Sequence, residues 1–291
     1  MRAAIIGTGN IGTDLLVKLL RLDFVRFVAF VGRRPLTKKI PDGVLYSPRG
    51  IQFFIENEKA CDVVFDCTDA HSAIENSKVF FQQGITVIDM TPSKIGQMCV
   101  PNVNCGCLAD VKNVNMVTCG GQVSIPILNY ISSRCTVKYA EVITQISSES
   151  AGIATRLNID KYIETTEKAI LSLTSVQSCK VILNVNPHPE TTMQTTILMR
   201  AGKGDFSNFH EFVEQMREYV PKYEVIRPPT YVGELLIVSV KVTGSGDYLS
   251  IYAGNLDIIN CAAIEITKKI AQLTGRGDAH GTNSYESVLD I

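Results

Sequence analysis

The sequence lacks an excess of either charge. Among its 291 residues, 28 lysines and arginines balance 29 aspartates and glutamates, which gives a formal net charge of −1. Acidic and basic residues are also mixed along the chain. Because nucleic-acid and anionic-membrane surfaces are bound through basic patches, this balance argues against both kinds of partner. Small-molecule chemistry is therefore the first expectation.

Long apolar runs are missing as well. The N-terminal run at residues 3–6 is too short for a signal peptide or a membrane span, so we expect a cytoplasmic protein. The nine cysteines are an odd number in a chain that needs no disulfides, and we expect most of them to be buried thiols. Cys105-Gly106-Cys107 lacks the second pair of ligands that a zinc site requires, so no metal site is predicted.

Apolar runs and helix-sized segments alternate in the first part of the chain. Strands are expected at 3–7, 25–31, 63–65 and 85–88, which predicts an α/β domain with a parallel sheet. The pattern changes near Val114. Beyond it we expect strands at 139–146, 179–185, 195–199 and 235–242, with helices near 123–132, 157–172 and 208–219. This order favours a second, α+β domain, followed by an amphipathic helix over 256–273 and a loosely held tail.

A glycine-rich turn follows the first expected strand. Residues 7–12 match the pattern G-x-G-x-x-G between a strand and a helix. In such a turn Gly7 permits the tight bend, Gly9 lets a pyrophosphate approach the backbone, and Gly12 allows the helix to pack on the strand. The helix N-terminus adds N–H groups and a partial positive charge. A turn needed only for packing is the alternative, but the context favours a Rossmann-type dinucleotide-binding domain.

The end of the second expected strand indicates which dinucleotide. NAD enzymes place an acidic residue there for the ribose 2′-hydroxyl. This chain instead has Arg33 and Arg34, which could hold a 2′-phosphate through charge-assisted hydrogen bonds. Solvated arginines on a loop are the alternative. We predict NADP(H) in preference to NAD(H).

Cys119 stands between an expected strand and an expected helix and is followed by Gly120 and Gly121. A helix N-terminus stabilises a thiolate, so we expect a lowered pKa for this cysteine. The same N–H groups could hold an oxyanion formed when the thiolate attacks a carbonyl. A buried cysteine with a packing role is the alternative.

Four segments carry a family resemblance. Residues 7–15, 113–122, 150–160 and 252–258, in this order, are similar to the acylating acetaldehyde dehydrogenases. The resemblance covers the chain except its tail. It implies reversible oxidation of a short aldehyde to an acyl-CoA with a nicotinamide cofactor and coenzyme A, beside an aldolase that supplies the aldehyde.

The resemblance also implies roles for individual residues. Cys119 would form the acyl thioester. Cofactor contacts would come from Gly7, Thr8, Gly9, Asn10, Ile11, Gly12, Ser150, Ala151, Gly152, Thr155, Arg156, Asn158 and Asn255. Residues 1–117 and 255–291 would form the dinucleotide-binding domain, and residues 118–254 the catalytic and dimerisation domain of a homodimer.

The chain departs from the family in three respects. Arg34 replaces an acidic residue, and the loop with Cys105 and Cys107 does not match in a chain shorter than the norm. We match the family's Arg-Asp-Thr step with Met193-Gln194-Thr195, so Gln194 replaces the aspartate thought to act as a base. An amide cannot accept a proton at neutral pH, although it can orient a thiol. Glu149 or His188 could supply the missing base.

These departures suggest a divergent, biosynthetic reductase of another acyl thioester. Two further interpretations stay open. One is a reductase of an acyl phosphate, for which Arg156 is the candidate cation. The other is a non-catalytic cofactor-binding scaffold, which would have no physical need for a thiol at a helix N-terminus.

Overall fold

The computed structural model describes residues 1–36, 39–152, 156, 159–188 and 191–276. The chain divides into two compact units. The first comprises Met1–Met98, Gly106–Met116 and the described part of Ala263–Ile291, and the second comprises Cys99–Cys105 and Val117–Ala262. Thr155, Asn158 and most of the tail lie outside the described residues, so the expectations for them are not addressed by the structure.

The first unit contains a seven-stranded, fully parallel sheet in the order β3-β2-β1-β4-β5-β7-β6. Its strands are β1 (Arg2–Ile6), β2 (Arg26–Val31), β3 (Tyr46–Ser47), β4 (Val63–Asp66), β5 (Thr86–Asp89), β6 (Gln97–Met98) and β7 (Asn113–Asn115). The strand order reverses beside β1, which lies between β2 and β4. This reversal is the topological switch point at which doubly wound sheets bind ligands.

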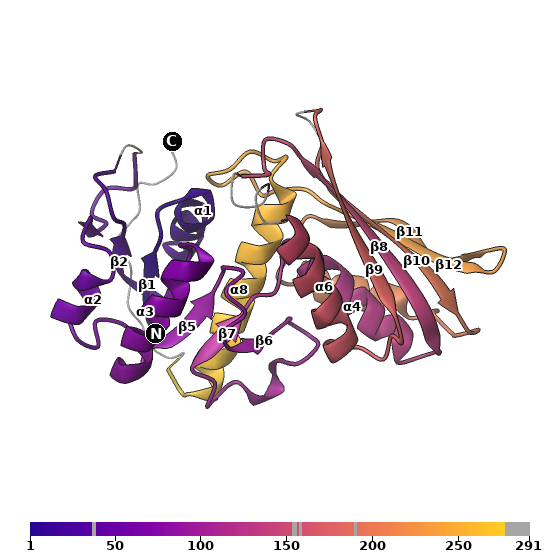
Figure 1. The fold of residues 1–291 in the computed structure, drawn as a ribbon, viewed down its shortest axis with the longest axis horizontal. Helices are drawn as coiled ribbons and strands as arrows, with labels where there is room; N and C mark the ends of the chain where they lie inside the picture. The colour runs from indigo at the N-terminus through magenta and orange to yellow at the C-terminus, as the bar shows by residue number, and fades with distance from the viewer. Residues whose placement is uncertain (37–38, 153–155, 157–158, 189–190, 277–291) are drawn as a thin grey trace. The chain divides into compact units, whose positions relative to one another are not determined.

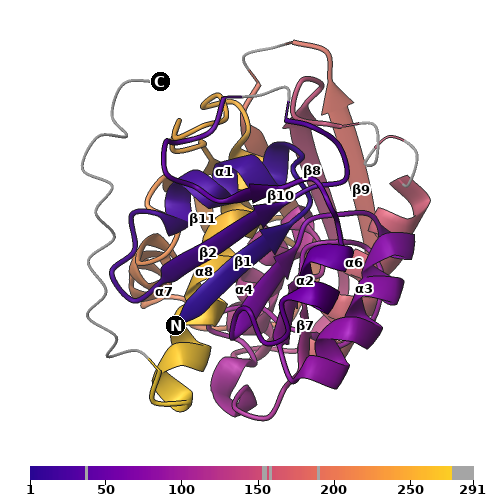
Figure 2. The same ribbon diagram turned by 90° about the vertical axis from the view of Figure 1, so that its left-hand side faces the viewer.

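Helices cover both faces of this sheet. Figure 2 shows α1 (Asn10–Leu19) on one side of β1 and β2, and α2 (Gln52–Glu56) and α3 (Ala70–Gln83) on the other. Because the strands are buried from both sides, they consist of apolar runs rather than alternating residues. In the core, the rings of Phe54 and Phe80 meet edge to face at 5.0 Å beneath the apolar side chains of β1, β2 and β4. The predicted Rossmann-type α/β fold is confirmed.

The second unit contains a five-stranded mixed sheet in the order β11-β12-β10-β8-β9. Its strands are β8 (Val137–Ser147), β9 (Cys179–Asn186), β10 (Met193–Ala201), β11 (Tyr223–Val232) and β12 (Leu235–Val242). Only the β8–β9 pair is parallel. In Figure 1, α4 (Cys119–Ser132) and α6 (Ile159–Leu173) lie on one face of this sheet. The rings of Phe209 and Phe212 on α7 (Phe209–Arg217) contact the ring of Tyr130 on α4.

The strands of the second unit alternate between a buried and a half-exposed face. In β10, Met193, Thr195, Ile197 and Met199 are buried, whereas the residues between them are half-exposed. This period of two places alternate side chains on opposite faces of the sheet. One face therefore packs under the helices, and the other presents a mixed polar and apolar surface.

Most sequence-based elements are confirmed, but the short strands β3 and β6 and the longer strand β11 were not expected. The strand expected at 235–242 has the bounds of β12, and the helix expected at 256–273 is α8 (Gly254–Leu273). Strand β11 was not expected because it contains Pro228 and Pro229. Proline is tolerated there because β11 is an edge strand whose register with β12 shifts at these positions. No helix in the described ranges is both long and apolar enough to cross a bilayer.

Candidate active site

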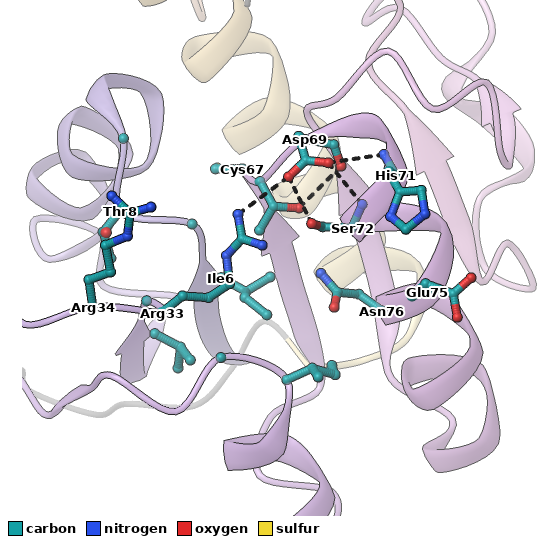
Figure 3. Close-up of a pocket in the computed structure, with 17 residues that line it drawn as sticks. Ile6, Thr8, Arg33, Arg34, Cys67, Asp69, His71, Ser72, Glu75 and Asn76 are labelled. Atoms are coloured by element: carbon teal, nitrogen blue, oxygen red, sulfur yellow. Dashed lines mark hydrogen bonds and ion pairs between the residues drawn. The ribbon is translucent and has the colours of Figure 1, made fainter.

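A cavity of about 510 Å³ opens at the carboxyl ends of β1, β2 and β4 in the first unit (Figure 3). Gly7, Thr8 and Gly9 line it together with Arg33 and Arg34. Asn10, Ile11 and Gly12 form the first turn of α1 directly behind this turn. The structure thus brings the predicted phosphate turn and both predicted arginines to one cavity at the switch point of the sheet.

The three glycines of the turn are required for different reasons. Gly7 has a φ of +106°, and a Cβ on it would lie 2.4 Å from the carbonyl of Cys67. A Cβ on Gly12 would lie 2.0 Å from the Gly7 oxygen. Around Gly9, in contrast, no atom lies within 4 Å of an added Cβ. The chain itself therefore excludes side chains at Gly7 and Gly12, whereas at Gly9 it leaves room for a ligand to approach the backbone.

The two arginines differ in what they contact. The Arg33 guanidinium lies 3.5 Å from the Asp69 carboxylate (Figure 3), and both side chains are more than half exposed. Asp69 also accepts hydrogen bonds from the N–H groups of His71 and Ser72, at 3.1 and 3.0 Å, and so caps α3. These hydrogen bonds and the Arg33 charge lower the pKa of Asp69. The Arg34 guanidinium makes no ion pair or hydrogen bond with any described residue.

Cys119 is the first residue of α4 in the second unit. Its neighbour Thr118 caps the helix by accepting the Gly121 N–H at 2.9 Å. Val117, two residues before Cys119, has a φ of +61°, which a β-branched residue rarely adopts. Backbone strain of this kind gathers at functional sites, where the surrounding structure enforces it.

The thiol of Cys119 lies beside a tyrosine that the sequence analysis did not select. The Tyr162 hydroxyl oxygen on α6 lies 3.6 Å from Sγ and accepts the Gly120 N–H at 2.9 Å. Burial raises the pKa of Cys119, while hydrogen bonds from Tyr162 and from the N–H groups of Gly120 and Cys119 itself oppose that rise. The expected lowered pKa is therefore wrong for this structure, because the loss of solvation outweighs the helix N-terminus.

Gln194 does not lie with Cys119. On β10, Thr195 faces the helices, and its Oγ1 lies 3.0 Å from that of Thr144. A Cβ on Gly120 would lie 3.4 Å from the same Thr144 hydroxyl oxygen, so this face adjoins the first turn of α4. Because adjacent strand residues point to opposite faces, Gln194 points away. No described contact links Gln194 to Cys119, and its catalytic role stays a prediction.

The predicted cofactor segment after β8 is held by its own side chains. Arg156 donates from Nε to the Ala151 carbonyl at 2.9 Å and from its guanidinium to the Ser148 carbonyl at 2.7 Å. Ser150 is buried, and its hydroxyl donates to the Ser147 carbonyl at 2.9 Å. A Cβ added to Gly152 would have no atom within 4 Å. Arg156 is thus occupied by backbone carbonyls.

The structure also describes three other residues with predicted roles, Asn255, Glu149 and His188. Asn255 at the start of α8 is 2% exposed, and its side-chain oxygen has no hydrogen-bond partner among the described residues. Glu149 and His188 each donate a backbone N–H to a nearby side chain, Ser147 and Asn186 respectively. No described contact links either of them to Cys119.

The comparisons with known proteins agree with this geometry. A family model described as prokaryotic acetaldehyde dehydrogenase, dimerisation, matches residues 119–250. The acetaldehyde dehydrogenase of Pectobacterium atrosepticum is 46% identical over 285 residues, which cover 94% of this chain and 96% of the relative. The chain belongs to the acetaldehyde dehydrogenase family. The family member of Geobacillus stearothermophilus is 38% identical over 94% of this chain and 96% of its own length.

Solved structures outside the family share its fold. Aspartate semialdehyde dehydrogenase II of Vibrio cholerae matches with a TM-score of 0.64 at 15% identity, over 94% of this chain and 98% of that one. The Candida albicans enzyme, solved with NADP, matches with a TM-score of 0.60 at 14% identity, over 94% and 99%. This family member therefore has the architecture of the semialdehyde dehydrogenases.

Proposed function

We propose that this protein is an acylating aldehyde dehydrogenase that interconverts a short aldehyde and an acyl-CoA through a thioester on Cys119. The observation that carries the proposal is the placement of the Cys119 thiol at the N-terminus of α4, beside the Tyr162 hydroxyl and the Gly120 N–H. The named relatives are acetaldehyde dehydrogenases, which makes acetaldehyde and acetyl-CoA the first substrates to test.

A nicotinamide cofactor fits the residues present. The space beside Gly9 suits a pyrophosphate at the start of α1. The family resemblance adds Asn255, whose side-chain oxygen has no hydrogen-bond partner among the described residues. Arg34 lines the cavity and has no ion-pair partner among the described residues, which favours NADP(H) over NAD(H). When bound, the cofactor supplies the hydride acceptor or donor for the reaction.

In the aldehyde-oxidising direction, the chain's own chemistry centres on Cys119. Its thiolate bonds to the carbonyl carbon, and the carbonyl oxygen becomes an alkoxide of a tetrahedral thiohemiacetal. After oxidation, the acyl group is held as a thioester on Sγ. The coenzyme A thiol loses its proton and attacks this thioester, so the acyl group moves to coenzyme A and the Cys119 thiolate leaves. The reverse sequence reduces an acyl-CoA.

The acyl-phosphate alternative is less favoured. It requires a cation beside the nucleophile, and Arg156, the candidate for that role, is hydrogen-bonded to the carbonyls of Ala151 and Ser148. A purely structural role is disfavoured too, because a scaffold has no need for a thiol held against a phenol at the start of a helix.

The same proposal includes a homodimer formed through residues 118–254, with residues 1–117 and 255–291 binding the dinucleotide. The family model that covers 119–250 is described as a dimerisation region. Leu198 and Ile237 are paired across β10 and β12 on the half-exposed face of the second sheet, opposite the helices, and Ile143 lies on the same face of β8, paired with Thr196. Apolar side chains in register on such a face suit a subunit interface. The family resemblance also suggests an aldolase-type partner.

The test is thioester reduction with a nucleophile control. Purified protein is mixed with acetyl-CoA or propionyl-CoA, and the absorbance of NADPH and, separately, NADH is followed. We expect oxidation of the reduced cofactor by the wild type, with NADPH preferred, and none by Cys119→Ala. Tight NADPH binding without turnover of any short acyl-CoA would contradict the coenzyme A chemistry.

A further inference from the structure

The Tyr162 hydroxyl has a defined place against the proposed nucleophile. Its oxygen lies 3.6 Å from Cys119 Sγ and 2.9 Å from the Gly120 nitrogen. The missing side chain of Gly120 creates this place, because an added Cβ would lie 2.1 Å from the hydroxyl oxygen. Cys119 and Gly120 on α4 and Tyr162 on α6 therefore pack together around the Cys119 sulfur.

The donors and acceptors around the Tyr162 hydroxyl determine which hydrogen bonds it can form. The Gly120 N–H can only donate, so the phenol oxygen accepts from it and the phenol proton remains available to the sulfur. Burial raises the pKa of Tyr162 far above its ordinary value, and the neighbouring Cys119 raises it further. The phenol is thus neutral near pH 7. It can donate a hydrogen bond but cannot serve as a base.

The position of Tyr162 is fixed by its own helix and by α4. The Thr166 hydroxyl donates to the Tyr162 carbonyl at 2.7 Å, and its oxygen also lies 2.7 Å from that of Thr118. Thr118 in turn caps α4. These contacts hold α6 against the first turn of α4, so the hydroxyl meets the sulfur in a preorganised geometry.

We propose that Tyr162 is a catalytic residue that donates a hydrogen bond to the Cys119 thiolate, both before it attacks the carbonyl and when the thioester releases it. The assignment rests on the proposed function, since it takes Cys119 as the nucleophile. The hydroxyl transfers no proton in this role. Instead, it lowers the free-energy cost of a negative charge on a partly buried sulfur.

The surroundings of Cys119 make this hydrogen bond important. Burial raises the pKa of its thiol, and the groups that oppose the rise are the Tyr162 hydroxyl and two backbone N–H groups. Within the part of the chain that the structure describes, Tyr162 is thus the one side chain that favours the thiolate, and no cation does so. Removing its hydroxyl should make the sulfur less reactive near neutral pH.

The experiment measures the reactivity of Cys119 directly. Wild type, Tyr162→Phe and the matched control Tyr223→Phe are alkylated with iodoacetamide across a range of pH, and the rate at Cys119 is followed by mass spectrometry of its peptide. Tyr223 is a fully buried tyrosine on β11 whose hydroxyl has no hydrogen-bond partner among the described residues, so its loss controls for removal of a buried hydroxyl.

We expect the alkylation midpoint of Tyr162→Phe to lie about one pH unit higher and its rate at pH 7 to fall about tenfold, because one hydrogen bond to a charged group is lost. The shift stays moderate because the backbone N–H groups of Gly120 and Cys119 still favour the thiolate. In acetyl-CoA reduction, kcat should fall while KM for acetyl-CoA stays unchanged. Tyr223→Phe should match the wild type in each measurement.

The outcomes separate this inference from the proposed function. An unchanged alkylation profile in Tyr162→Phe, with Cys119→Ala inactive, would overturn the role of Tyr162 and leave Cys119 as the nucleophile. Full thioester reduction by Cys119→Ala would instead overturn the proposed function. Should Tyr162→Phe lose its fold, judged by its melting temperature, Gly120→Ala provides the second test. Its Cβ displaces the hydroxyl, so it must raise the alkylation midpoint with the tyrosine still present.

Discussion

Cofactor selectivity depends on how the two arginines of the cavity are engaged. Arg33 shares its charge with Asp69 at 3.5 Å, and Asp69 is itself needed to cap α3. A 2′-phosphate must compete with this carboxylate for Arg33. Arg34 has no such partner in the described structure and lines the same cavity. We therefore predict that Arg34 contributes most of the discrimination between NADPH and NADH.

The magnitude follows from the contacts. A charge-assisted hydrogen bond contributes about 1.5–3 kcal/mol, so Arg34→Ala should weaken NADPH binding by about ten- to a hundredfold. Arg33 forms an exposed, shared ion pair worth up to about 1 kcal/mol, so Arg33→Ala should weaken it by up to about fivefold. Neither variant should change the Kd for NADH.

Titration of the cofactor's fluorescence with each variant, and KM values in acetyl-CoA reduction, measure these effects. Equal losses of NADPH and NADH affinity in Arg34→Ala would refute the reasoning, because they would place the arginine at a group that both cofactors share. A larger loss in Arg33→Ala would refute it as well, since Asp69 would then not restrain Arg33.

Three further predictions concern other parts of the molecule. Gly7→Ala should lower the free energy of unfolding by about 2 kcal/mol or more because of its positive φ, whereas Gly9→Ala should keep the wild-type melting temperature and lose cofactor affinity. Burial raises the pKa of Asp89 to about 6 against hydrogen bonds from Ser93 and Thr91. A raised carboxyl pKa means that folding favours the protonated form, so stability falls as pH rises from about 4 to about 6, by up to about 3 kcal/mol. The free energy of unfolding, measured with denaturant, should fall over this pH range in the wild type relative to Asp89→Asn. The same pH dependence in both proteins would contradict the prediction. Gln194→Ala should leave the alkylation rate of Cys119 unchanged, and a marked decrease would contradict its place on the far face of β10.

The phosphate turn could be predicted from the sequence because its chemistry is local. Gly7, Gly9 and Gly12 are fixed by a strand, a turn and a helix that are adjacent in the chain, and the structure gives a steric reason for Gly7 and Gly12 and leaves open space at Gly9. The same holds for Cys119, since the strand and helix that flank it are contiguous segments. Local backbone geometry of this kind is encoded within a few residues.

Contacts between distant segments could not be predicted in this way. Tyr162 follows Cys119 by 43 residues, and its hydroxyl reaches the sulfur only when α6 packs on α4. The same packing partly buries Cys119, and desolvation then reverses the pKa shift expected from the helix N-terminus. The burial of a side chain depends on the packing of the whole unit, so no local sequence pattern predicts it.

Local sequence patterns were enough to predict the doubly wound sheet, the glycine-rich turn and the place of Cys119 at a helix start, because apolar periodicity and glycine spacing act over short stretches of chain. Which side chains surround Cys119 depended on the tertiary structure. Strand alternation turned Thr195 toward the site and Gln194 away from it, and helix packing brought Tyr162 to the sulfur. A shift of one residue along a strand reverses the face a side chain occupies, so the register of the folded sheet determines which of two neighbours adjoins the site.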